Sequence, residues 1–178
     1  MNFVDDIANM RIGPARNVCA FSPNRKYRYK LSRTWNAAQP LLVVIMLNPS
    51  VADEFKLDPT VTRVVKRAMY NNFGGVVIHN LFALVSTYPK ALKTSFAPIG
   101  QENDVYIAET LQTQRSQVCV AWGPGGAFLG RERTVLKMCY QYEVPVSCLG
   151  LTDQGFPRHP LHVAYSVPFQ PYAGRFAE

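Results

Sequence analysis

The sequence has few cysteines and no long apolar run. Four cysteines occur among 178 residues, and no two of them form a Cys-x-x-Cys pair. That spacing argues against a zinc site. Cys119 and Cys148 lie in apolar, strand-like runs, so we expect free, buried thiols. No stretch approaches the roughly 18 apolar residues of a membrane-spanning helix. The first residues, Met1 to Asp6, lack the apolar region of a secretory signal, which favours a cytoplasmic protein.

Acidic residues are also scarce. Asp and Glu number 12 against 19 Lys and Arg, which gives a formal net charge of +7. A basic surplus favours a polyanionic partner such as DNA or a nucleotide, because neutralising phosphates releases counterions. Many basic proteins bind no nucleic acid, so charge leaves this question open. The hydrophobic content of 48% is typical of a globular chain, and its length predicts one domain over residues 1–178.

Alternating strand and helix patterns predict an α/β fold. Four apolar runs predict buried parallel strands at residues 41–47, 75–81, 117–122 and 145–149. Between them, helical spacing of apolar residues predicts helices at 60–71, 103–114 and 128–142. This order predicts a three-layer α/β/α sandwich with a central four-stranded parallel sheet, covering about residues 40–165. A β-hairpin is expected at one sheet edge, over about residues 16–35, and a C-terminal tail over 166–178.

Polar residues collect where the predicted strands end. In open parallel sheets, ligands bind beyond the carboxyl ends of the strands. Asn48 follows the first core strand, and its amide can either stabilise the turn at Pro49 or orient a water or ligand. Ser50 and the loop after it could bring backbone N–H groups to a phosphate. Asp53 and Asp58 are the nearby carboxylates that could act on water, although Asp58 also suits a helix N-cap.

Two further strand ends carry unusual residues. Asn80 sits in an apolar run, where its amide either bonds to neighbouring backbone or reads the edge of a pyrimidine. His79 should face the other side of the sheet and hydrogen-bond beneath a helix. Trp122-Gly123 is either a flexible turn or a place where backbone approaches a ligand closely.

A histidine loop and a basic strand complete the candidates. His159 lies between Pro157 and Pro160, which stiffen the loop, and it can donate a hydrogen bond near neutral pH. His162 is a weaker candidate in the same loop. Cations alternate with aromatic residues over positions 27–35, a pattern that suits either a strand facing phosphates and bases or a half-exposed edge hairpin; the cations are Arg28, Lys30 and Arg33.

Five short motifs in order give the chain a resemblance to a known family. They are Leu47-Asn48-Pro49-Ser50, Asp58-Pro59-Thr60, Asn80-Leu81-Phe82, Ala121-Trp122-Gly123 and His159-Pro160-Leu161. The set resembles a bacterial and phage domain family of unassigned function, over residues 27–163. That family in turn distantly resembles the uracil-DNA glycosylase superfamily, which implies a similar fold. Membership of a bacterial and phage family implies a location in the bacterial cytoplasm, or in the host cytoplasm for a phage-encoded chain.

The glycosylase resemblance implies a reaction and residue roles. Asn48 would place the attacking water, Asn80 would read the base, and His159 would stabilise the leaving base. Phe82 or Phe55 would stack on an extruded base, and Leu161 would wedge into the duplex. No metal or cofactor is implied. Together with the strand-end and loop patterns above, this gives further candidates: catalytic Asp53 and Asp58; substrate-binding Ser50, Trp122 and Gly123; and DNA-binding Arg28, Lys30, Arg33, Arg158 and His162.

Two departures from the superfamily leave the substrate open. The loop after Asn48-Pro49 lacks the tyrosine of the best-known uracil enzymes, and Leu161 replaces their usual small residue. We therefore expect an unusual or modified base rather than uracil in particular. Two alternatives remain: an inactive module that binds nucleic acid or a modified base in a phage or defence system, and a transferase that modifies bases or nucleotides.

Overall fold

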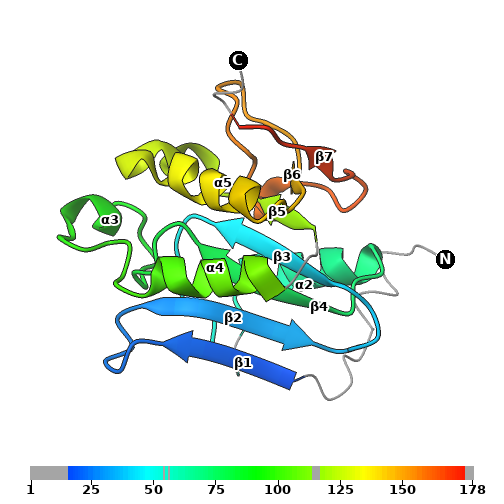
Figure 1. The fold of residues 1–178 in the computed structure, drawn as a ribbon, viewed down its shortest axis with the longest axis horizontal. Helices are drawn as coiled ribbons and strands as arrows, with labels where there is room; N and C mark the ends of the chain where they lie inside the picture. The colour runs from blue at the N-terminus through cyan, green and yellow to red at the C-terminus, as the bar shows by residue number, and fades with distance from the viewer. Residues whose placement is uncertain (1–15, 54, 56, 114–116, 175–178) are drawn as a thin grey trace.

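The structure of the chain is a computed structural model that describes residues 16–53, 55, 57–113 and 117–174. Seven strands in these ranges form one sheet in the order β1-β2-β4-β3-β5-β6-β7 (Figure 1). Their bounds are β1 Arg16–Phe21, β2 Arg28–Thr34, β3 Leu41–Met46, β4 Gly75–Asn80, β5 Val118–Val120, β6 Val146–Cys148 and β7 Gln170–Pro171.

The sheet is mixed, and it is larger than the four-stranded parallel sheet predicted from the sequence. Neighbouring strands pair in parallel from β4 through β3 and β5 to β6. The outer pairs, β1 with β2, β2 with β4 and β6 with β7, are antiparallel. The predicted edge hairpin is confirmed as β1 and β2. The predicted C-terminal tail is wrong in part, because β7 within it extends the sheet beside β6.

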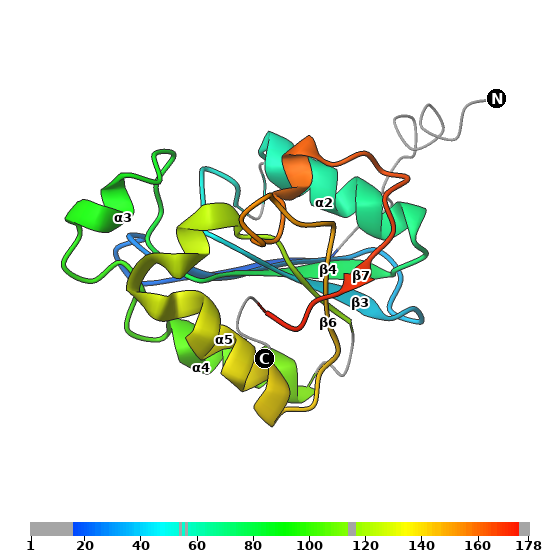
Figure 2. The ribbon, with the colours of Figure 1, turned by 90° about the horizontal axis from the view of Figure 1, so that it is seen from above.

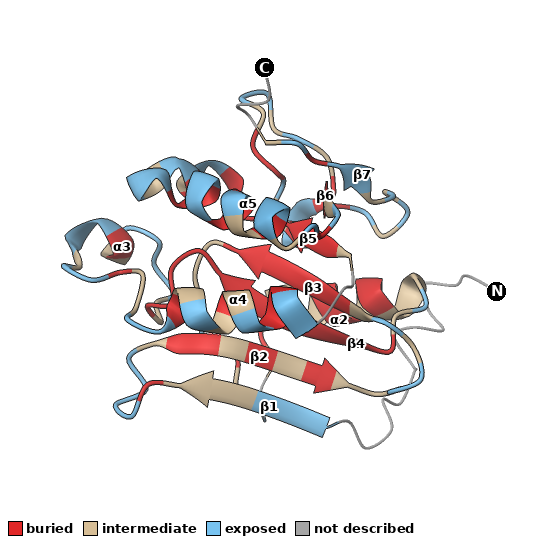
Figure 3. Cartoon of the chain, in the orientation of Figure 1, coloured by how far each residue is buried: buried red, intermediate tan, exposed pale blue. Residues whose placement is uncertain are grey.

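Helices cover both faces of the sheet. Helix α2 (Pro59–Tyr70) lies on one face, while α4 (Asn103–Thr113) and α5 (Arg131–Gln141) lie on the other (Figure 2). One apolar core joins α2 to inward residues of β3 and β4, and a second joins α4 and α5 to the opposite face of the same strands. Figure 3 shows the central strands buried between these layers. The short elements are α3 (Ala91–Thr94), η1 (Gly123–Gly130) and η2 (Pro160–His162).

The ends of two helices follow from local chemistry. Asp58 accepts a hydrogen bond from the Val61 N–H at 2.7 Å, and Pro59 follows it, so α2 begins there. The helix predicted over 128–142 begins later, at Arg131. Leu129 and Gly130 have φ values of +54° and +64°, and this left-handed backbone separates η1 from α5. The predicted helices near 60–71 and 103–114 are confirmed within one residue at each end.

His79 lies on the face of β4 opposite Asn80, as the alternation of a strand predicts. Its Nδ1 is 2.9 Å from the Tyr29 carbonyl, and its Nε2 is 2.9 Å from the Thr110 hydroxyl of α4. The carbonyl can only accept, so Nδ1 carries the proton and Nε2 accepts from Thr110. Burial lowers the pKa of His79 to about 3, so the side chain is neutral and acts as a packed hydrogen-bonding link.

Candidate functional site

A cavity of about 250 Å³ opens at the carboxyl ends of β3 and β5. Leu47 and Asn48 directly follow β3, and Trp122 follows β5, so the cavity lies where an open parallel sheet exposes its strand ends. The volume lies near the lower end of small-ligand sites. The lining residues are Arg28, Met46, Leu47, Asn48, Ser50, Asp58, Thr60, Val61, Ser86, Thr87, Pro89, Trp122 and His159.

The amide of Asn48 has a defined orientation. Its Nδ2 donates to the Ser86 carbonyl at 2.8 Å and to the Pro49 carbonyl at 3.2 Å. Both partners are acceptors, so the group facing them must be the NH₂ and not the oxygen. The side-chain oxygen Oδ1 has no protein donor among the described residues, and Asn48 is only half-buried. Asn48 therefore offers the cavity a fixed hydrogen-bond acceptor.

His159 offers the opposite capacity. Its Nδ1 accepts from the Leu161 N–H at 3.4 Å, a weak cap at the start of η2. Burial lowers the pKa of His159, the neighbouring His162 lowers it further, and Asp58 opposes both. The ring is thus neutral at pH 7, with its proton on Nε2, because Nδ1 is the acceptor. His159 can donate a hydrogen bond from Nε2 without carrying a charge.

Asp58 is the one carboxylate that lines the cavity among the described residues. It is buried, and its Oδ1 caps α2 through the Val61 N–H. Its charge also acts on Arg28 and on His159 across the cavity, since it raises the pKa of both. The capping role predicted from the sequence is confirmed. A role as a base on water stays a prediction.

Arg28 lines the cavity although its side chain is 98% buried. Its Nη1 donates to the Ala52 carbonyl, while its Nε is buried without a partner among the described residues. Burial lowers the pKa of Arg28, but a guanidinium stays charged at neutral pH. The sequence placed Arg28 on a strand surface facing DNA; the fold instead places it inside the cavity wall.

Trp122 forms the deep wall of the cavity. It is 2% exposed, and its indole Nε1 has no partner among the described residues. Gly126 packs against it so closely that a Cβ there would lie 2.2 Å from Trp122 Cδ1. Gly123 adopts a φ of +64°, donates its N–H to the Pro157 carbonyl and links the η1 turn to the His159 loop. It is not a lining residue of the cavity.

Asn80 does not line the cavity, although the sequence grouped it with Asn48 and His159. Its Cα pairs in the sheet with that of Met46, which does line it. The side chain is 1% exposed, and both its oxygen and its nitrogen lack partners among the described residues. Its backbone carbonyl accepts from Asn103 Nδ2 of α4 at 3.0 Å. Asn80 is therefore a buried, unpaired amide on the strand beside the cavity.

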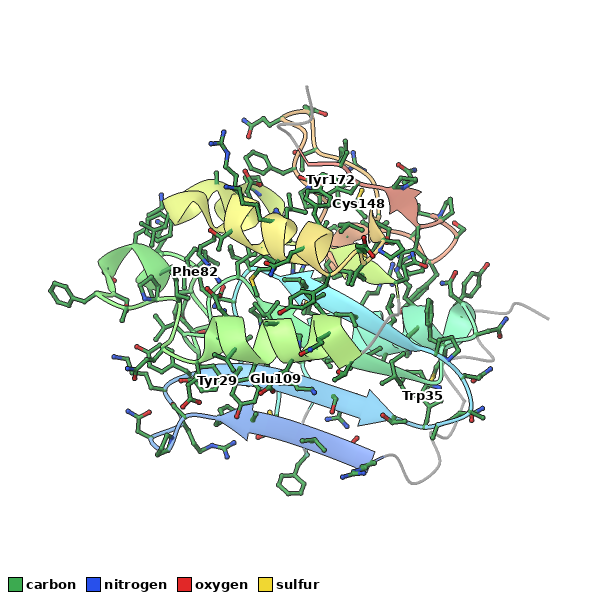
Figure 4. The ribbon with its side chains drawn as sticks, in the orientation of Figure 1. Tyr29, Trp35, Phe82, Glu109, Cys148 and Tyr172 are labelled. Atoms are coloured by element: carbon green, nitrogen blue, oxygen red, sulfur yellow. The ribbon has the colours of Figure 1, made fainter. Side chains whose placement is uncertain are left out.

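Phe82 is placed in the core and not at the site. It is fully buried, and its ring centroid lies 5.6 Å from that of Phe128. Figure 4 labels Phe82 among the side chains of the fold. A side chain with no exposed surface has no face to stack on a base, so in this conformation the predicted stacking role is contradicted. Phe82 follows the buried Leu81, and packing in the apolar core accounts for the burial of both side chains.

The other predicted residues lie outside the cavity. Arg33 is buried and donates to the Asp53 carbonyl at 2.9 Å, while Lys30 is half-buried on the same strand. The Asp53 side chain accepts from the Phe55 N–H in the loop before α2. The His159 loop carries the exposed predicted residues Arg158, Leu161 and His162. Their proposed contacts with DNA stay predictions.

Several lining residues were missed in the sequence. Thr60 and Val61 reach the cavity from the first turn of α2, and Ser86, Thr87 and Pro89 reach it from the loop after β4. The one available signal was the Ser86-Thr87 pair soon after a strand end. An apolar stretch, Leu81 to Val85, separates this pair from the strand end, so its position in the sequence does not indicate a site.

The described part of the chain contains neither a candidate metal site nor a membrane-spanning helix. No group of three or more His, Cys, Asp or Glu residues in it could hold a metal ion. No helix in the same part is both long enough and apolar enough to cross a membrane. Its four cysteines are free thiols, and burial raises the pKa of Cys119 and Cys139 to about 12, which leaves both unreactive as nucleophiles.

Comparison with known proteins gives a family and no assigned activity. A search of curated proteins and a search of solved structures each found no match to the chain. A scan against protein families matched residues 28–161, which run from the buried Arg28 to the end of the His159 motif. The matching family is described as a protein of unknown function (DUF1643). Because the match spans most of the chain, the protein belongs to the DUF1643 family.

Proposed function

We propose that the protein is a DNA glycosylase-like enzyme that hydrolyses the N-glycosidic bond of an unusual or modified base. One observation carries the proposal: Asn48 and His159, which are far apart in sequence, line one cavity with complementary free atoms. Asn48 presents an acceptor that could hold a water, and His159 presents a neutral donor that could bind a leaving base.

The reaction makes different demands on its two sides. When the bond from C1′ to the base breaks, its electron pair leaves with the base, and the sugar becomes oxocarbenium-like. The neutral Nε2–H of His159 would stabilise negative charge that develops on a base oxygen. Asn48 Oδ1 would accept a hydrogen bond from the water that adds to C1′ and so hold it in line, and the proton that this water loses would pass to the departing base. The sugar is a strong electrophile at that point, so placement of the water contributes more than a strong base.

Asn80 fits this proposal only with a rearrangement. Its amide carries two donors and an acceptor, which is the set needed to read a pyrimidine edge. Its unpaired atoms cost on the order of 1–3 kcal/mol each, and a base could satisfy them. Met46, the paired neighbour of Asn80 in the sheet, stands in the cavity wall. Movement of its flexible side chain would open the way to Asn80.

The test is base release from duplex and single-stranded DNA that contains uracil or hypermodified pyrimidines. We expect release by the wild type, and for Asn48→Ala a fall in kcat of about 100-fold or more with little change in KM, since an acceptor for water acts mainly on the chemical step. Asn71→Ala is the matched control. Asn71 also bonds a backbone carbonyl, that of Arg67, but at the far end of α2.

The proposed mechanism is wrong if wild type and Asn48→Ala release every tested base at the same rate. A loss of activity that Asn71→Ala shares would point to general destabilisation rather than to water placement.

A binding module that lacks catalysis is the second candidate, and the state of Asp58 favours it. Asp58, the one carboxylate of the described residues that lines the cavity, caps α2, so those residues offer no second carboxylate as a general base for a water at Asn48. For this candidate, we expect DNA or modified-nucleotide binding that weakens steeply with salt and yields no product. Base release above the level of Asn48→Ala would exclude it.

A further inference from the structure

Arg28 differs from two other buried arginines, Arg67 and Arg131, in how few side-chain partners it has. Arg67 donates four hydrogen bonds to the carbonyls of Val163, Ala164, Tyr165 and Val167. Arg131 binds both carboxylate oxygens of Asp104 and the Leu81 carbonyl. Among the described residues, the side chain of Arg28 makes a single hydrogen bond, from Nη1 to the Ala52 carbonyl. No carboxylate of the described chain lies within ion-pair distance of it.

The burial of Arg28 with so few partners carries a cost in free energy. Burying an ionised group costs several kcal/mol unless a partner of opposite charge or several acceptors compensate it. Asp58 acts on Arg28 only at longer range, and its Oδ1 is engaged with α2. A guanidinium also presents its donors as a planar fork that matches the oxygens of a phosphate. The guanidinium of Arg28 in the cavity wall is therefore suited to bind an anionic group.

The surrounding atoms fit the same kind of group. The hydroxyl-bearing residues Ser50 and Thr60 line the cavity with Arg28, and Thr60 belongs to the first turn of α2. α2 has 12 residues, so its N-terminal N–H groups and dipole favour a negative ligand. Asp58, whose carboxylate lines the same cavity and caps α2, offsets part of this field.

We propose that the ligand of this cavity is a nucleotide, and that one phosphate group of it binds the buried Arg28. This inference rests on the proposed function for the nucleoside part of the ligand, and it adds the phosphate as a required element. The phosphate has two sources, the monoester of a free nucleotide and the diester flanking an extruded base in DNA.

Equilibrium binding tests the proposal without any chemical step. The probes are deoxyuridine and the four common deoxynucleosides, their 5′-monophosphates, inorganic phosphate, and a short single-stranded DNA, each titrated by calorimetry. For at least one base, we expect the monophosphate or the oligonucleotide to bind wild type about tenfold or more tightly than the nucleoside. This corresponds to one charge-assisted hydrogen-bonded pair. Preference for the monophosphate identifies a free nucleotide, and preference for the oligonucleotide identifies DNA.

Two variants test whether Arg28 causes the preference for ligands that carry a phosphate. In Arg28→Gln the preference for phosphate should fall to near one. Arg28→Lys keeps the charge but loses the fork, and should retain only part of the preference. Lys137→Gln is the control, since it removes one positive charge from the exposed face of α5. Circular dichroism and urea midpoints of each variant show whether it is folded.

The proposal is overturned if wild type binds nucleosides and nucleotides equally and binds no inorganic phosphate. That comparison needs no variant, so it stands even if Arg28→Gln does not fold. A phosphate preference that survives in folded Arg28→Gln or Arg28→Lys at its full size also overturns it. Base release measured on the same preparations reports on the proposed function separately, because binding of the phosphate does not require hydrolysis.

Discussion

Buried polar groups that contact α4 and α5 make more hydrogen bonds than those around the cavity. On the α4 and α5 side, His79 uses both ring nitrogens, and Arg131 bonds Asp104 and the Leu81 carbonyl. Asn103 donates to two backbone carbonyls, and only its Oδ1 is left over. Around the cavity, Arg28, Asn80 and Trp122 all keep buried nitrogen atoms without partners among the described residues.

On our proposal, the difference separates groups that hold the fold from groups that bind a ligand. A paired buried group stabilises the arrangement of elements that it joins, and its removal leaves its partner exposed to the full desolvation cost. An unpaired one lowers stability, and it persists where a ligand satisfies it. We therefore expect changes on the α4 side to alter stability with little effect on activity, and changes at the cavity to do the reverse.

His159→Ala should show the largest effect on the cavity side. Removing one donor to a developing oxyanion costs about 100-fold to 1,000-fold in rate, or about 2.7–4 kcal/mol of transition-state stabilisation. Stability should change by less than about 1 kcal/mol, because the bond from Leu161 N to Nδ1 is long at 3.4 Å. The measurements are single-turnover base release and urea unfolding. A large loss of stability with unchanged base release would show that His159 holds the fold, as the groups that contact α4 do, and does not act in the reaction.

Arg131→Ala should show the largest effect on the α4 side. The change removes three hydrogen bonds and leaves the buried Leu81 carbonyl with a lost partner, so we expect a loss of about 2–3 kcal/mol in the free energy of unfolding. Rates per folded molecule should be unchanged. Arg133→Ala, an exposed position on the same helix, is the control. A stability loss of equal size in the control would remove the assignment to the Asp104 and Leu81 contacts.

His79→Gln should sharpen the comparison through pH. The pKa of His79 is about 3 in the folded state against about 6.5 when unfolded, so below pH 6.5 the unfolded state binds a proton that the folded state does not. Stability from the neutral ring is complete above about pH 6.5 and falls by up to about 1.4 kcal/mol per pH unit toward pH 3. The variant should lose this share of the slope. Parallel curves for variant and wild type in urea titrations at pH 7 to pH 4 would contradict it.

Substitution of Asp58 should give the smallest effect. Asp58 holds the fold as the cap of α2, and it also lines the cavity. Asp58→Ala removes the α2 cap and should cost about 1 kcal/mol of stability. Asp58→Asn keeps a capping oxygen and should restore most of that loss. If the carboxylate acts only as a cap, Asp58→Asn should also leave base release near the wild-type rate. A large fall in rate for this folded variant would show that the carboxylate takes part in the chemistry.

Much of the local structure could be predicted because it depends on neighbours in sequence. Continuous apolar runs marked β3 and β4, and helical spacing of apolar residues marked α2 and α4, because these patterns reflect burial on a sheet or on one helix face. Asn48, Asp58, Trp122 and His159 were predicted as site residues because they follow strand ends or open a helix, and all four line the cavity.

Other features depended on the path of the chain through space. Asn80 was grouped with Asn48 because both lie at the ends of apolar runs, but Asn80 is buried, and its sheet partner Met46 lines the cavity instead. Phe82 resembled a stacking residue in its motif, yet packing against Phe128 buries it. β7 has two residues, too few for any periodic signal, and its pairing with β6 came only from the fold.

The sequence by itself determined the α/β alternation, the cap of α2 and the strand ends at which polar residues collect, because each follows from contacts within a few residues. Only the tertiary structure decided that Arg28, on an antiparallel strand next to β4, lies buried beside Asn48 and His159. A pattern of cations and aromatics cannot show which of its members the sheet will cover. Burial without a partner, which makes Arg28 informative about the ligand, depends on every element that surrounds the cavity.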